Sequence, residues 1–383
     1  MKAKNTVSPA AIEILFRIFG IWPNTSFVLL RRLFWIISIV FEQIGQYRYI
    51  VKHFHLMELF EIIIILSLAV AMTRFFIVLV LFWCKQRTFS KILTMMAIDW
   101  EKCSSTKFSI FATYNAKLSE RFVNMTVILY SIAAILTGTK IFIKHMDSGN
   151  ASNVSTRLLI VEMDLPFDTN QRFVYESIII IQFFHLLLCS NIMGVFNALL
   201  INLILHIGGE IDILRESLIG IIPKKDRDSS NHFTIKEVIK KHQKIITFSE
   251  HIEHLYSYIA MVLFVSDIMI ICCLGSTIVA SIGRPDVLKN IIRVVLFYFV
   301  MNMEAFVFCF AGEYLSAKSK SIGDAAYASL WYESDSRTNR IILFLIMRSQ
   351  NQLTITVGKI MNLSLERFTS VSLFHIYFIR TVF

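Results

Sequence analysis

Seven apolar segments are the feature of this sequence that most restricts how the chain can fold. They lie near residues 33–46, 59–83, 122–143, 174–205, 256–282, 290–311 and, more weakly, 357–382. A helix needs about 20 apolar residues to cross the hydrocarbon core of a bilayer. With 55% hydrophobic and 17% charged residues, the chain is also too apolar for a soluble domain of 383 residues. The sequence therefore predicts an all-α membrane protein with seven transmembrane helices.

Lysine and arginine are divided unevenly between the two sides of these segments. The N-terminal part and the loops after the second, fourth and sixth segments hold 24 of them, and the other side holds 8. Because basic loops stay on the cytoplasmic side, we expect a cytoplasmic N-terminus and an extracellular C-terminus, in the plasma membrane. The net charge of +10 has the same explanation, so no nucleic-acid partner is expected.

This topology divides the chain into four parts. Residues 1–32 form a cytoplasmic N-terminal segment, in which residues 11–22 are amphipathic and are expected to lie on the membrane surface. Residues 33–311 hold helices one to six, with an outer loop at 144–173 and a cytoplasmic helical region at 206–255. Residues 312–356 form a cytoplasmic anchor segment with a helix near 331–350, and residues 357–383 form the last helix.

The outer loop supports this orientation, because it carries two glycosylation sequons at Asn150 and Asn153. An inside N-terminus also argues against a G-protein-coupled receptor, whose N-terminus lies outside. We found no glycine-rich phosphate loop, no hydrolase motif and no His/Cys spacing typical of metal sites. An enzyme, a cofactor and a metal site are therefore not expected.

Several ionisable residues lie inside the apolar segments. Arg74 falls in the second, Asp267 in the fifth and Glu304 in the sixth. An ion at bilayer depth is costly unless it has a partner. We therefore expect Arg74 to pair with Glu304 or Asp267.

The last segment differs from the others because polar residues recur along one side. At 100° per residue, one stripe contains Glu366, Thr369, Ser370, Leu373, Tyr377, Arg380 and Thr381. Such a helix belongs at the centre of a bundle. Two interpretations stay open: the stripe borders water, or the helix is buried and packs against its neighbours.

Residues 312–370 carry a specific motif. It includes Gly312-Glu313-Tyr314-Leu315, Ser319, Ala325-Ala326-Tyr327, Trp331-Tyr332-Glu333, Arg348-Ser349-Gln350, Leu353-Thr354, Gly358-Lys359 and 363–370 (LSLERFTS). This order and spacing resemble the C-terminal signature of insect odorant receptors. Weaker similarities lie upstream, at Tyr175-Glu176, Gln182, His206 and His242-Gln243.

The resemblance implies a seven-helix subunit of a ligand-gated cation channel, tuned to volatile odorants and assembled with a coreceptor as a heterotetramer in the lipid bilayer. It also implies an intracellular anchor and a pore lined by the last helix. From the stripe and the resemblance together, the predicted pore lining is Glu366, Ser370, Leu373, Tyr377, Ile379, Arg380 and Thr381.

An odorant site should be apolar and aromatic with a few polar groups, in the outer half of the bundle. The residues that we predict for it are Ser67, Ala71, Met72, Phe75, Ile132, Leu136, Thr139, Tyr175, Ile179, Phe183, Met269 and Cys273. Two other functions stay open: a seven-span chemosensory receptor acting through G proteins, and a gustatory-type receptor channel.

Overall fold

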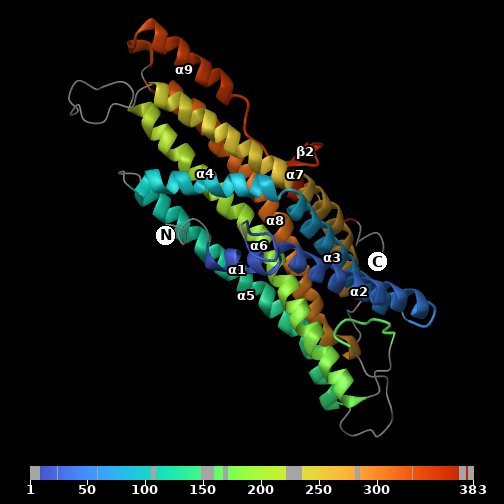
Figure 1. Ribbon diagram of the computed structural model, residues 1–383. Helices are drawn as coiled ribbons and strands as arrows, with labels where there is room; N and C mark the ends of the chain where they lie inside the picture. The colour runs from blue at the N-terminus through green and yellow to red at the C-terminus, as the bar shows by residue number, and fades with distance from the viewer. Residues whose placement is uncertain are drawn as a thin grey trace.

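The computed structural model describes residues 9–23, 25–57, 59–104, 109–147, 159–166, 171–220, 235–280, 285–329, 331–370 and 377. Its helices are α1 (Ala10–Ile18), α2 (Val28–His53), α3 (Leu59–Cys84), α4 (Gln86–Ser104), α5 (Ser109–Asp147), α6 (Arg172–Ile219), α7 (Ile235–Ala280), α8 (Pro285–Tyr327) and α9 (Ser336–Ser349), with a 3-10 turn at Trp331–Glu333. They form one elongated bundle (Figure 1), and the predicted all-α membrane fold is confirmed.

Five of the described helices are long and apolar enough to cross a membrane, namely α3, α5, α6, α7 and α8. They contain the predicted second to sixth spans. The predicted first span lies within α2, which is absent from these five. Its apolar run is interrupted by Glu42 and is preceded by Arg31 and Arg32.

Helix α6 runs through the centre of the bundle. Every residue from 191 to 205 is buried, so this stretch is enclosed by protein on all sides. A helix that is apolar all round is typical of such a core position. Its few polar side chains are paired across the helix interface, since Asn202 accepts a hydrogen bond from Ser119 (2.8 Å) and Asn191 from Ser131 (3.1 Å).

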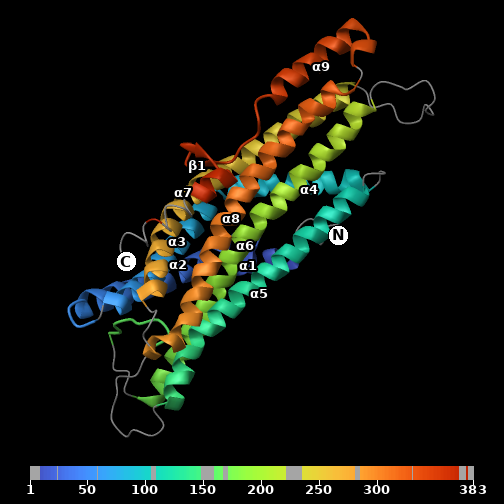
Figure 2. The ribbon, with the colours of Figure 1, turned by 180° about the vertical axis from the view of Figure 1, so that it is seen from behind.

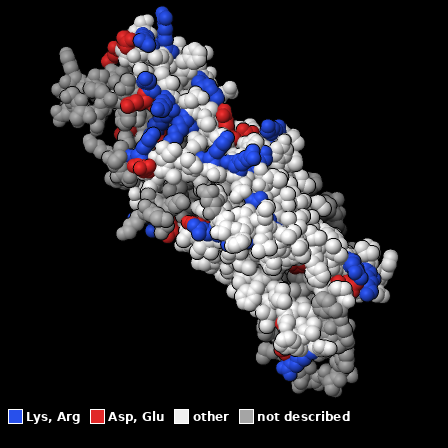
Figure 3. All heavy atoms as spheres, in the orientation of Figure 1, with Lys and Arg blue, Asp and Glu red and all other residues white. Residues whose placement is uncertain are grey.

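Helices α6, α7 and α8 are much longer than a bilayer is thick. At 1.5 Å per residue, the 48 residues of α6 extend for about 70 Å. At one end of the molecule α8 packs against α9, and the ends of α6 and α7 reach the same end of the bundle, as both views show (Figure 2). On the face seen in Figure 3, charged side chains gather towards the α9 end, above a wide uncharged band. Of the predicted helical region 206–255, residues 206–219 belong to α6 and 235–255 to α7, and the predicted helix near 331–350 is present as α9.

The N-terminal helix is not where the sequence suggested. Helix α1 packs into the bundle instead of lying on the membrane surface. The ring of Phe16 meets those of Phe82 (5.9 Å) and Phe196 (5.5 Å), and Phe19 stacks on Trp35 at 4.0 Å. The prediction was wrong because an amphipathic helix can bury its apolar face equally well against lipid or against protein.

The predicted last helix starts later than residue 357. A short antiparallel hairpin, β1 (Thr356–Val357) with β2 (Met361–Asn362), comes first, and the next helical residues are 365–370. Gly358 and Lys359 turn the chain with φ values of +57° and +63°. The hairpin docks on α7, where the Gly358 amide donates to the carbonyl of Ser257 at 2.9 Å.

Candidate ligand cavity and buried ion cluster

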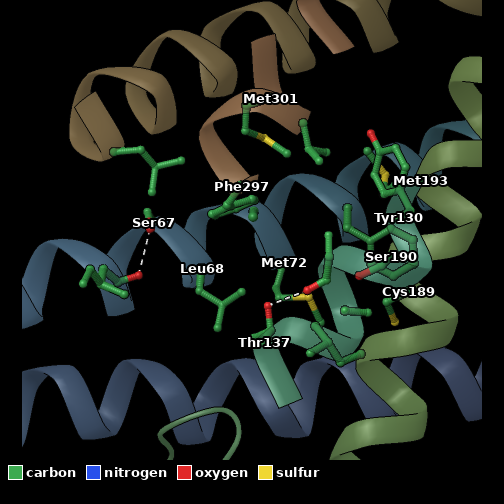
Figure 4. Close-up of a pocket in the computed structure, with 18 of the residues that line it drawn as sticks. Ser67, Leu68, Met72, Tyr130, Thr137, Cys189, Ser190, Met193, Phe297 and Met301 are labelled. Atoms are coloured by element: carbon green, nitrogen blue, oxygen red, sulfur yellow. Dashed lines mark hydrogen bonds between the residues drawn. The ribbon is translucent and has the colours of Figure 1, made fainter. Parts of the chain in front are cut away.

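A cavity of about 140 Å³ lies among α3, α5, α6 and α8. Side chains from these four helices point towards it in Figure 4, including Met72, Phe297 and Met301. The residues that line it are Gln46, Ile64, Ile65, Ser67, Leu68, Ala71, Met72, Arg74, Phe75, Tyr130, Ala133, Ala134, Thr137, Ile160, Glu162, Leu186, Cys189, Ser190, Met193, Leu274, Val294, Leu296, Phe297, Val300 and Met301. The lining is mostly apolar, with a few polar groups, as a small-molecule site requires.

Residues 159–166, which we call the strap, close one side of this cavity. The side-chain oxygen of Gln182 on α6 accepts from the amide of Ile160 (3.1 Å), and its side-chain nitrogen donates to the carbonyl of Val161 (3.1 Å). At the other end, the amide of Asp164 donates to the carbonyl of Gly45 on α2 at 3.0 Å. The strap is thereby held between two helices, with Ile160 on the cavity wall.

Three buried ions form a cluster beside the cavity. Arg74 is only 4% exposed and donates to Asp267 on α7 and, at 2.9 Å, to Glu304 on α8. The expected pairing of Arg74 is confirmed, and it involves both carboxylates. Tyr130 on α5 adds a longer hydrogen bond to Glu304 (3.4 Å) and accepts one from Asn197 (3.0 Å). Because unpaired ions in apolar surroundings are very costly, this ion cluster ties α3, α5, α7 and α8 together.

The ion cluster also borders a second, smaller cavity of about 30 Å³. Arg74 lines the first cavity, whereas Asp267 lines the second together with Leu363 and Phe368 of the last segment. The ring of Phe368 meets that of Phe306 on α8 edge to face, with 5.7 Å between centroids. The same charged residues therefore adjoin the larger cavity on one side and the beginning of the last helix on the other.

Whether a predicted pocket residue lines the cavity depends on the helix that carries it. All four on α3, namely Ser67, Ala71, Met72 and Phe75, line the cavity. The predicted α5 residues Ile132, Leu136 and Thr139 do not line it. The helix turns another face towards it, made of Tyr130, Ala133, Ala134 and Thr137. Ile132 is instead 46% exposed.

On α6 and α7 the predictions also miss the cavity. Tyr175, Ile179 and Phe183 lie earlier on α6 than the lining residues Leu186, Cys189, Ser190 and Met193. On α7, Met269 is 54% exposed, and neither it nor Cys273 lines the cavity, whereas Leu274 does. Sequence reasoning also omitted α8, Gln46 and the strap. Uniformly apolar helices offer no periodic signal that marks the inner face, so only packing reveals it.

The predicted pore lining is described only in part. Glu366, Ser370 and Tyr377 are exposed in this single chain, Tyr377 at 64%. The carbonyl of Glu366 accepts hydrogen bonds from the hydroxyls of Thr369 (2.8 Å) and Ser370 (2.9 Å). The remaining predicted lining residues Leu373, Ile379, Arg380 and Thr381 lie outside the described residues, as do the sequons at Asn150 and Asn153.

Comparisons with known proteins agree with this architecture. Two structures of the insect olfactory receptor OR5 from Machilis hrabei, one of them in complex with eugenol, match with a TM-score of 0.73. They cover 97% of this chain and 96% of OR5 at 16% identity, so they establish a shared fold.

Sequence relatives give the same assignment. Odorant receptor 22c of Drosophila melanogaster is 26% identical over 163 residues, which is 40% of each chain. Odorant receptor 10 of Aedes albopictus is 29% identical over 138 residues, 35% of each chain. The alignments thus span less than half the length of these curated relatives. A family model described as 7tm Odorant receptor matches residues 58–374, which is most of the sequence. The chain therefore belongs to the 7tm odorant receptor family.

Proposed function

We propose that this chain is the odorant-binding subunit of a ligand-gated cation channel and that the odorant occupies the cavity among α3, α5, α6 and α8. The observation that carries this proposal is a mostly apolar cavity of about 140 Å³ in a chain of this family. Apolar cavities of about 150 Å³ accept a molecule the size of benzene, which is the size range of volatile compounds. The eugenol complex of the structural neighbour OR5 supports the same kind of ligand.

The ion cluster offers a route from ligand to pore. A ligand in the cavity would contact Phe297 and Met301, which precede Glu304 on α8. If it binds the open state better than the closed state, it shifts the population towards opening. The movement that we propose is of α7 and α8 against the last segment, through Phe306 and Phe368.

We further propose that the last segment lines the pore of a heterotetramer formed with a coreceptor, with the N-terminus in the cytoplasm and the C-terminus outside. The excess of Lys and Arg in the loops assigned to the cytoplasm supports this orientation. A glycosylation map tests it: occupancy is expected at Asn150 or Asn153, with none at the sequon Asn24-Thr25-Ser26 on the predicted cytoplasmic side. Occupancy at Asn24 alone would reverse the topology.

The functional test is coexpression with an insect odorant coreceptor and recording of currents under a panel of volatile compounds. We expect currents that persist when G-protein signalling is blocked. Currents abolished by the block would favour a receptor that acts through G proteins.

Two variants test whether the currents depend on ligand binding in the cavity. Ala71→Phe adds a ring at the cavity wall and should abolish responses with surface expression retained. Met269→Phe, on an exposed face of α7, is the matched control and should respond like the wild type. Equal responses from both variants would argue against the cavity as the ligand site.

A further inference from the structure

One fully buried amide side chain of the cavity, that of Gln46, has no hydrogen-bond partner in the part of the chain that the structure describes. Gln46 on α2 lines the cavity and is fully buried, at 0% exposure. Neither its amide nitrogen nor its amide oxygen has a hydrogen-bond partner among the described residues. Buried amides are nearly always satisfied, because leaving them unpaired is costly. An unsatisfied donor and acceptor on one side chain at a ligand cavity therefore indicates that the partner comes from the ligand.

Most of the other polar groups at the cavity already have partners. Ser190 makes no hydrogen bond among the described residues but is only partly buried, and the Nε atom of Arg74 is unpaired although its other guanidinium nitrogens bind Asp267 and Glu304. The hydroxyl of Ser67 donates to the carbonyl of Ile64 (2.8 Å), and that of Thr137 donates to Ala133 (2.9 Å), both within their own helices. Figure 4 shows these two hydrogen bonds as dashed lines. The hydroxyl of Tyr130 is engaged by the ion cluster and Asn197. Ser67, Thr137 and Tyr130 therefore need nothing from a ligand.

We propose that Gln46 is the polar anchor of the ligand and that it selects small apolar molecules carrying one hydroxyl group. The inference rests on the proposed function, since it names the ligand class of the same cavity. A hydroxyl can donate to the amide oxygen of Gln46 and accept from its amide nitrogen at once. A ketone can only accept, so it leaves the oxygen of Gln46 unpaired. A hydrocarbon leaves both atoms unpaired.

The test uses three probes of similar shape, namely cyclohexanol, cyclohexanone and methylcyclohexane. Their affinities are measured by ligand-dependent thermal stabilisation of the purified full-length chain and, separately, by currents from the chain coexpressed with coreceptor. We expect the wild type to prefer cyclohexanol to cyclohexanone and cyclohexanone to methylcyclohexane. Each step should be about tenfold, corresponding to one buried hydrogen bond left unmade.

In Gln46→Leu this preference for cyclohexanol should be lost. For each probe, the affinity of the wild type is divided by that of the variant, which cancels the differences in solvation between the probes. Gln46→Met, which keeps the length of the side chain, serves if the leucine variant folds poorly. Ser67→Ala and Thr137→Val are matched controls and should keep the preference, because their hydroxyls are already satisfied.

Three results would overturn the assignment. The first is a preference for cyclohexanol that survives in both Gln46 variants. The second is loss of the preference in Ser190→Ala with retention in the Gln46 variants, which would move the anchor to α6. The third is no stabilisation of the wild type by any probe. Failure of the proposed function is a separate outcome: the probes bind in the expected order, but no ligand evokes a current from the coexpressed chains.

Discussion

Replacement of Arg74 by methionine should prevent this protein from folding stably. Arg74 is the only cation that contacts Asp267 and Glu304 in the described structure, and all three side chains are at most 5% exposed. Methionine keeps the unbranched apolar stem of arginine but lacks the guanidinium group, so most of the loss is electrostatic. The variant would leave two carboxylates buried close together with no positive partner.

The magnitude follows from the geometry. Removing one member of a buried ion pair costs about 3–5 kcal/mol, and Arg74 serves two carboxylates, so the upper end or more is expected. Typical domains are stable by only about 5–15 kcal/mol. Asp267→Ala should cost less, because Arg74 keeps Glu304 as its partner at 2.9 Å. We still expect Asp267→Ala to reduce the folded yield.

Size-exclusion chromatography of a fluorescent fusion, extracted in mild detergent, measures the folded yield, and melting of the eluted peak measures stability. Arg48→Met is the matched control. Arg48 pairs with Asp164 at 3.3 Å, but its side chain is 61% exposed. Exposed pairs contribute only about 0–1 kcal/mol, so this variant should behave like the wild type. A normal peak and melting temperature for Arg74→Met would refute the argument.

Three further predictions concern other parts of the chain. Gly312→Ala should lower the melting temperature, because a Cβ at this position would collide with the backbone of Leu363 and push the last segment away from α8. Gln182→Leu should raise hydrogen exchange at the 160–161 end of the strap, since the hydrogen bonds that Gln182 makes to Ile160 and Val161 are lost. A hydrogen bond with the Thr338 side chain, helped by backbone amides, lowers the pKa of Asp335, which caps α9. Its contribution is therefore present at neutral pH and is lost progressively as pH falls below about 4 and through the lowered pKa, so Asp335→Ala should speed exchange of the α9 amides at pH 7 and progressively less as the pH is lowered further.

The helices could be predicted from sequence because they depend on local runs of apolar residues. The buried ion pairing could be predicted because few partners are available. A bilayer demands about 20 apolar residues for each span, and this requirement is visible as a run in the chain. Arg74, Asp267 and Glu304 were predictable as partners because charged residues inside apolar spans have few partners to choose from. The motif from Gly312 to Ser370 identified the family, and the family model that matches 58–374 confirms it.

The cavity wall could not be predicted in the same way. A helix such as α5 carries similar apolar residues on several faces, so Ile132 and Ala133 are equally plausible as cavity residues from sequence alone. The packing of α6 and α8 against α5 decides between them. The same ambiguity explains the wrong prediction for α1, whose apolar face packs against protein instead of lipid. Gln46 is one polar residue among several on α2, and only its burial without a partner sets it apart. The sequence by itself determined the apolar segments that form α3 and α5 to α8, and the family to which the chain belongs. The tertiary structure decided which faces meet, because packing depends on residues that are far apart in the chain.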